Sequence, residues 1–232
     1  MKLEMITTLR ILIIALLSYV PTCAVAGYAE SFIAKKMGDS IPEEYGFLTL
    51  NPFVHFSFLG FSLMITGLLY GHYFWLFAGL PGFGKTVPLM PSLISGPSHK
   101  LKTFIECTGR SYAHLAMALF AAVCMMVFFD VAQLSSGAAR IAAGADQVTS
   151  LTIALCTLLF FFFQQNVALF CIYFILGCFH TILNLYFTDI RGFSGSSFII
   201  LMLGLALFIV FFGHFLEYFV QILLYGLERI LH

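Results

Sequence analysis

Two combinations of a carboxylate and an imidazole in this sequence could do acid–base or metal chemistry. Glu30 lies at the end of the first apolar run, and His55 follows the segment GFLTLNP, residues 46–52. His214 and Glu217 stand three residues apart in the last apolar run, on one face of a helix. Because an ionisable group inside a membrane is costly unless it is paired, we interpret His214 and Glu217 as a candidate intramembrane polar pair.

The composition is typical of an integral membrane protein and not of a soluble domain. The 232 residues are 61% hydrophobic and 9% charged, and their mean hydropathy is +1.00. Soluble domains carry roughly 25% charged residues. Lys plus Arg and Asp plus Glu number eleven each, so the chain has no basic field that would attract nucleic acid. The expected partners are membrane lipid and other transmembrane proteins.

The apolar runs predict a single all-α polytopic membrane domain, since a hydrocarbon core of about 30 Å needs roughly 20 residues of helix. Six helices are expected, near residues 9–33, 54–80, 104–131, 148–166, 167–187 and 196–227. The fourth and fifth share one run, in which Gln164-Gln165-Asn166 either makes a turn or lines an interior. Without that turn the helices number five. The distribution of Lys and Arg places the N-terminus in the cytoplasm and counts Arg110 among the cytoplasmic charges.

Two motifs at a defined spacing connect these apolar runs. The first consists of Gly38-Asp39, then Gly46-Phe47-Leu48-Thr49-Leu50-Asn51-Pro52 and His55, and the second is FGKTVPLMP, residues 83–91. They resemble the Gly-Asp pair with G-R-L-T-L-N-P-x-x-H, and the linker W-A-K-P-V-P-V-N-P, of the site-2 protease family of intramembrane zinc metalloproteases in its compact form without a PDZ domain. Weaker similarities lie at Gly109 and Asn184. The resemblance implies a bundle of about six transmembrane helices with a short re-entrant or extended segment after the first.

The catalytic positions of that family hold different residues here. Aligned on the Gly-Asp pair, the three functional positions of H-E-x-x-H hold Ala26, Gly27 and Glu30, and the third ligand position holds Gly192 or Ser194. In the family the two histidines bind zinc and the glutamate is the general base. Alanine and glycine can neither ligate a metal nor transfer a proton. The resemblance therefore predicts no catalytic residue, no metal site and no cofactor in this chain.

The leading hypothesis is a catalytically inactive site-2 protease homologue, a pseudoprotease that acts as a membrane scaffold, adaptor or accessory subunit of a membrane complex. We expect Glu30 to cap its helix or to pair with Lys35 or with a neighbouring chain, and His55 to bond to backbone at the turn. The predicted partner-binding surface comprises Glu30, Leu48, Thr49, Leu50, Asn51, Pro52, His55 and Asn184.

Two alternatives depend on other residue combinations. A zinc site rebuilt from Glu30, His55 and Asp189 would make the chain an active intramembrane metalloprotease. His214 and Glu217 could instead serve a small channel or carrier. The resemblance further implies a multi-pass protein of a bacterial inner membrane or of an organelle membrane of bacterial origin.

Overall fold

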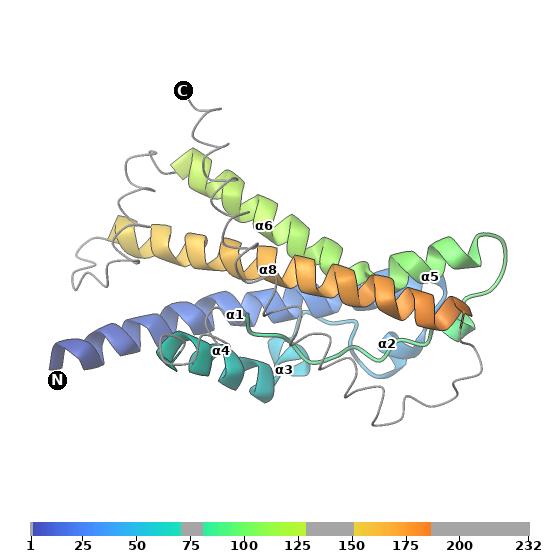
Figure 1. The fold of residues 1–232 in the computed structure, drawn as a ribbon, viewed down its shortest axis with the longest axis horizontal. Coiled ribbons are helices and arrows are strands. Elements are labelled where there is room, and N and C mark those ends of the chain that lie inside the picture. The colour runs from blue at the N-terminus through green and yellow to red at the C-terminus, as the bar shows by residue number, and fades with distance from the viewer. Residues whose placement is uncertain (1, 71–80, 129–150, 187–232) are drawn as a thin grey trace.

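Helices form the regular structure of this protein in a computed structural model that describes residues 2–70, 81–128 and 151–186 (Figure 1). In chain order the elements are α1 (Lys2–Met37), α2 (Ile41–Glu44), α3 (Pro52–His55), α4 (Phe58–Tyr70), the 3-10 turn η2 (Pro91–Leu93), α5 (His99–Cys107), α6 (Gly109–Phe128) and α8 (Leu151–Tyr186). No strand occurs within these ranges. The expected all-α class is confirmed for the described residues.

Among the residues that the structure describes, three helices are long and apolar enough to cross a membrane. They are Leu12–Met37 within α1, Gly109–Phe128, which is α6, and Ala154–Leu185 within α8. The apolar part of α4, Phe58–Leu69, is shorter. Length and composition thus agree with the prediction of a helical membrane protein.

The three long helices pack against one another, and α4 lies along α1 (Figure 1). Small side chains of α6, Ala118 and Ala121, meet Phe163 and Val167 of α8. Alanine lets two helices approach closely, which is how helices associate where lipid supplies no hydrophobic driving force. Between α1 and α6 the contact is made by Ala26 against Ala113 and Met117, and between α1 and α4 by Ala15, Tyr19 and Cys23 against Met64.

The fourth apolar run differs from the expected pair of helices 148–166 and 167–187. Helix α8 continues without interruption from Leu151 to Tyr186, so the turn expected at Gln164-Gln165-Asn166 is wrong. The alternative, that these residues line an interior, is confirmed for Gln165 and Asn166, which are buried, and is wrong for Gln164, which is exposed. Their side chains find hydrogen-bond partners on α1 and α6, so the helix can continue through them.

Two other helix boundaries also differ from the expected ones. The run expected near 104–131 is broken at Thr108, which separates the amphipathic α5 from the apolar α6. Gly177 of α8 faces this break, where a Cβ would stand 2.5 Å from the Cys107 carbonyl oxygen. The helix expected from residue 54 begins at Phe58, after the separate short helix α3. The helix expected near 196–227 lies outside the described residues.

A short irregular segment follows α1 and turns back along it. Gly38 and Gly46 have φ values of +113° and +77°, which favour glycine, and they begin and end the turn that contains α2. The segment then reaches α3, where His55 contacts Gly27 of α1. Gly27 precedes Met37, the last residue of α1, by ten residues, which is about 15 Å along a helix axis. The segment after the first helix therefore returns to the level of the middle of α1.

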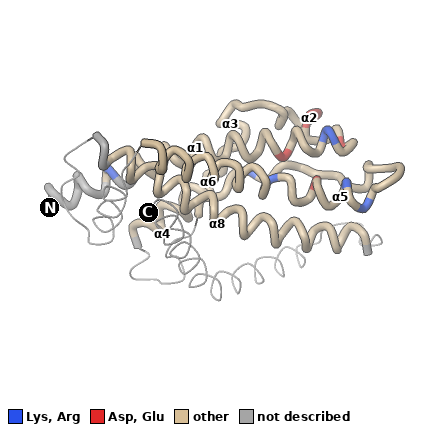
Figure 2. The backbone as a smooth tube through the Cα atoms, turned by 90° about the horizontal axis from the view of Figure 1, so that it is seen from above, with Lys and Arg blue, Asp and Glu red and all other residues tan. Residues whose placement is uncertain are grey.

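Most charged residues of the described chain gather at one end of the bundle, around α2 and α5 (Figure 2). Lys35, Lys36, Glu43 and Glu44 lie there with Lys100 and Lys102 of α5, and all but the half-buried Lys102 are exposed. Such a cluster is expected where helices leave the hydrocarbon region for water. Deeper in the bundle, charged residues are few, and those few define the site described next.

Candidate functional site

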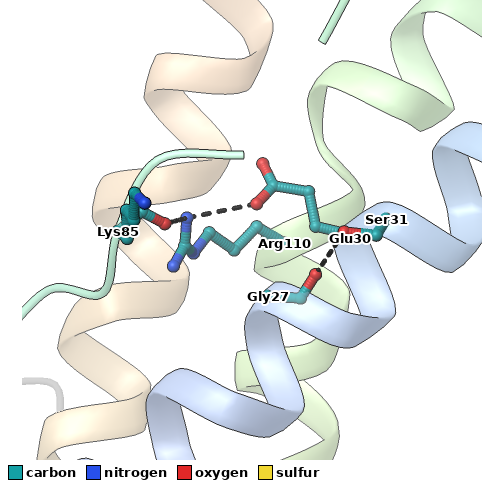
Figure 3. Close-up of polar contacts among 5 residues, drawn as sticks. All are labelled: Gly27, Glu30, Ser31, Lys85 and Arg110. Carbon is teal, nitrogen blue, oxygen red and sulfur yellow. Dashed lines mark hydrogen bonds and ion pairs between the residues drawn. The ribbon is translucent and has the colours of Figure 1, made fainter. Parts of the chain in front are cut away.

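A buried ion pair joins α1 to α6 (Figure 3). Arg110 Nη1 donates to Glu30 Oε2 over 3.1 Å, and the two side chains are only 3% and 9% exposed. Glu30 belongs to the span of α1, and Arg110 is the second residue of α6. Removing two charges from water is expensive, so each of these groups depends on the other for compensation. The pair is the strongest electrostatic feature of the described interior.

The Arg110 guanidinium is enclosed on its other sides as well. Nη1 also donates to the carbonyl oxygen of Lys85 at 3.1 Å, as Figure 3 shows. The guanidinium lies over the Tyr173 ring, 4.7 Å from its centroid, in a cation–π arrangement. A Cβ on Gly84 would stand 2.6 Å from Nη2. The segment that contains Gly84 and Lys85 therefore covers the ion pair.

His55 faces α1 with one ring nitrogen and its own loop with the other. Nε2 lies 2.7 Å from the carbonyl oxygen of Thr49, which can only accept, so Nε2 carries the proton and donates. Burial lowers the pKa of His55, which keeps the ring neutral and Nδ1 unprotonated. Nδ1 faces Gly27, where a Cβ would stand 2.1 Å away. The expected backbone bond of His55 is confirmed, and position 27 has room only for glycine.

A second polar group connects the three long helices at a neighbouring level. His114 Nδ1 bonds to Asn166 Oδ1 at 2.9 Å, and Asn166 Nδ2 donates to Thr22 Oγ1 at 3.2 Å. Ser18 Oγ donates to Gln165 Oε1 at 2.7 Å. These bonds run between α1, α6 and α8, and such interhelical hydrogen bonds fix helix register inside a membrane.

Two carboxyl groups meet beside the charged end of the bundle. Asp39 is fully buried, and its oxygens accept from the backbone N–H groups of Ile41 at 2.9 Å and Met90 at 2.6 Å. Glu106 of α5 is also fully buried, and no donor of the described residues reaches its oxygens. Burial, together with the neighbouring Asp39, raises the pKa of the Glu106 carboxyl to about 9. Burial and the neighbouring Asp39 charge thus favour the protonated form of the Glu106 carboxyl at neutral pH.

The structure brings some of the predicted site residues together and separates others. Glu30 is buried beside Arg110, while Gly27 and His55 are in contact. Lys35 pairs with Glu43 instead of Glu30, so the expected Lys35–Glu30 pair is wrong. Ala26 is buried against α6.

The predicted partner-binding loop is also placed. Its residues Leu48, Thr49 and Leu50 precede Asn51, which caps α3 by accepting from Phe53 N at 3.1 Å, and Pro52, the first residue of α3. Asn184 bonds within its own helix to His180 O at 2.8 Å and to none of the other predicted residues. Asp189, Gly192, Ser194, His214 and Glu217 lie outside the described residues.

Arg110 lies in a different environment from the one that the sequence predicted. It was expected among the cytoplasmic charges, but it is 2% exposed. The available signal was Glu30, a carboxylate within an apolar run that needs a compensating cation. Asn166, Tyr173 and Glu106 were not predicted as site residues, and their roles depend on partners distant in the sequence.

The residues at the family's catalytic positions do not fit a zinc ion. The single carboxylate there, Glu30, is already neutralised by Arg110. Across residues 2–70, 81–128 and 151–186, no group of three or more His, Cys, Asp and Glu side chains could hold a metal. No family model matches the chain, and no curated protein or solved structure matches it either. The described residues form a helical protein with three helices apolar enough to cross a membrane and a buried ion pair between two of them.

Proposed function

We propose that this protein is a non-catalytic, six-helix relative of the compact site-2 proteases that works as a membrane scaffold, adaptor or accessory subunit of a membrane complex. The observation that carries the proposal is the Glu30–Arg110 pair. Glu30 stands where the resemblance would put a zinc-binding histidine, and its counter-charge is a guanidinium of the same chain. A metal ion at this place would have to displace Arg110 from a buried contact.

Gly27 supports the same proposal from the other side of the site. The resemblance would put the general base at this position, and the His55 ring fills the space that such a side chain would need. A general base must reach the proton that it removes. With Gly27 at this position, the interior serves to hold α1, α3 and α6 together.

The loop before α3 supports a binding role. Leu50 is 58% exposed and Phe53 is 87% exposed, although His55, two residues after Phe53, is buried against Gly27 of α1. Neither the N–H nor the C=O group of Leu50 makes a hydrogen bond with any described residue. Irregular backbone at membrane depth is tolerated where protein covers it. An extended segment of another membrane chain would satisfy these groups by strand addition.

The test is site-specific photo-crosslinking in the native membrane, with a photoreactive phenylalanine at position 53 and at position 119 as the control. Leu119 is 59% exposed on the regular helix α6, where the proposal expects contact with lipid and not with a partner protein. We expect a discrete protein adduct from position 53 and none from position 119. Lipid adducts alone at both positions would contradict the proposal.

Elemental analysis of the purified protein tests the non-catalytic part. We expect no stoichiometric zinc in the wild type or in Glu30→Ala. Stoichiometric zinc that is lost in Glu30→Ala would make Glu30 a ligand and would favour the active metalloprotease instead. The proposed location, a bacterial inner membrane or a related organelle membrane, follows from the resemblance.

A further inference from the structure

The segment Gly82–Met90, here called the docked segment, is held by hydrogen bonds to its main chain and by the buried side chain of Val87, and Lys85 Nζ lies over the Phe47 ring. The Tyr19 hydroxyl reaches Phe83 O at 2.9 Å, and Lys85 N donates to His55 O at 2.7 Å. Arg110 donates to Lys85 O at 3.1 Å, and Asp39 accepts from Met90 N at 2.6 Å. These anchors come from α1, the turn after it, α3 and α6. The docked segment has neither helix nor strand of its own.

Two glycines let the docked segment lie close to Tyr19 of α1 and Arg110 of α6. A Cβ on Gly82 would stand 2.7 Å from the Tyr19 ring, and one on Gly84 would stand 2.6 Å from Arg110 Nη2. The groove side contributes Gly60 of α4, where a Cβ would stand 1.9 Å from Phe83 O. The groove thus admits an extended backbone with glycine at two alternate positions. Lys85 and Thr86, which follow, are exposed at its outer face.

We propose that this groove is a binding site for an extended peptide, that the docked segment is its internal occupant, and that a Gly-x-Gly segment of a partner membrane protein competes for it. The groove recognises its occupant by hydrogen bonds to the main chain and by the absence of side chains at two positions. A segment of another chain can meet both requirements. The internal occupant has the advantage of covalent attachment to the same chain, which raises its effective concentration. A competing segment must therefore be held nearby by the partner's own attachment to this protein.

This inference rests on the proposed scaffold function and gives it a chemical specificity. Displacement of the docked segment removes the Lys85 carbonyl from Arg110 and uncovers the Glu30–Arg110 pair. A partner segment with the same backbone chemistry restores that bond. A segment with a larger side chain at either glycine position meets Tyr19 or Arg110 and is rejected.

The first experiment measures binding of a labelled peptide with the sequence of residues 81–91, in which glutamine replaces Lys85. In Gly84→Val the internal segment cannot seat, so this variant should bind the peptide at least about tenfold more tightly than the wild type. Thr86→Val, at an exposed neighbouring position, is the matched control and should behave like the wild type. A peptide that carries valine at the position of Gly84 should not bind to any of them.

A second measurement uses the wild type alone, which keeps the inference testable if Gly84→Val does not fold. Trypsin cleavage after Lys85 requires release of the docked segment, because Lys85 N and O are both bonded. Excess glutamine peptide should accelerate that cleavage several-fold, and the valine peptide should not. Absence of acceleration, or absence of peptide binding to a folded Gly84→Val, overturns the inference. A protein adduct from position 53 in that case would leave the scaffold function standing.

Discussion

Gly27 of α1 and His55 of α3 face each other so closely that a Cβ on Gly27 would stand 2.1 Å from His55 Nδ1. Backbone and imidazole thus fit together at the place where the irregular segment returns to the middle of α1. Because His55 is held by the Thr49 carbonyl at its other nitrogen, the ring cannot swing away without losing that bond. This contact sets the distance between α1 and α3.

Gly27→Ala should lower the stability of the protein by about 1–3 kcal/mol, the usual cost of overpacking a core. Thermal unfolding in detergent is the measurement. In a His55→Ala background the same change should cost much less, since the ring that opposes the new methyl group is gone. Equal costs in both backgrounds would show that position 27 is sensitive for another reason.

Replacing one partner of the Glu30–Arg110 pair should lower the stability of the protein far more than replacing both partners. Arg110→Met alone leaves a buried carboxylate uncompensated and should cost about 3–5 kcal/mol, whereas the double variant with Glu30→Gln should recover much of that loss. The exposed Lys35–Glu43 pair is the control, and Lys35→Met should cost no more than about 1 kcal/mol. A double variant as unstable as Arg110→Met would contradict this account.

The Glu106–Asp39 contact should give stability a pH dependence of defined sign. Folding raises the pKa of Glu106 from its ordinary 4.5 to about 9. As pH rises between these values the unfolded chain loses this proton and the folded chain keeps it, so the free energy of unfolding falls. Glu106→Gln should flatten that fall between pH 5 and 9, whereas Glu44→Gln, at an exposed position, should not. A wild-type curve that rises over this range would contradict a raised pKa of Glu106 in the folded protein.

Chelators should leave the protein unchanged. With Glu30 neutralised by Arg110, EDTA is expected to shift neither the thermal unfolding midpoint nor the helix content measured by circular dichroism. A ligand that binds the folded protein raises the unfolding midpoint by mass action. Since we expect no zinc to bind, addition of zinc should leave the midpoint unchanged. A midpoint that falls with EDTA and recovers with zinc would point to a metal site.

The sequence predicted the helices from the length of the apolar runs, but it could not predict which polar residues would be buried together. Gln165 and Asn166 suggested a turn, because their partners Ser18 and Thr22 lie 147 and 144 residues away. Arg110 was counted among the cytoplasmic charges, since its partner Glu30 lies 80 residues away and is not visible in the local pattern. A local sequence pattern predicts the period and length of a helix. Whether a buried polar group finds a hydrogen-bond partner depends on the whole fold.

The candidate site was predictable only where its chemistry is local. His55 and Asn51 act through backbone groups two to six residues away, and a turn motif can indicate such bonds. The resemblance placed Glu30 and Gly27 at the centre of interest, but neither the ion pair nor the His55 contact can be read from it. The sequence analysis placed the docked segment in a motif that connects two apolar runs. It could not predict the packing of this segment, because its anchors come from four separate parts of the chain.

The distance in sequence between Glu30 and Arg110 also has a consequence for biosynthesis. The ribosome delivers Glu30 to the membrane long before Arg110, which follows 80 residues later. Until α6 is synthesised, the Glu30 carboxylate of α1 lacks its counter-charge. Quality-control proteases would then recognise α1 as an unassembled subunit. We expect a nascent chain truncated before α6 to be degraded faster in pulse-chase experiments than the same chain with Glu30→Gln. Equal lifetimes would mean that another interaction protects α1 from proteolysis before α6 is synthesised.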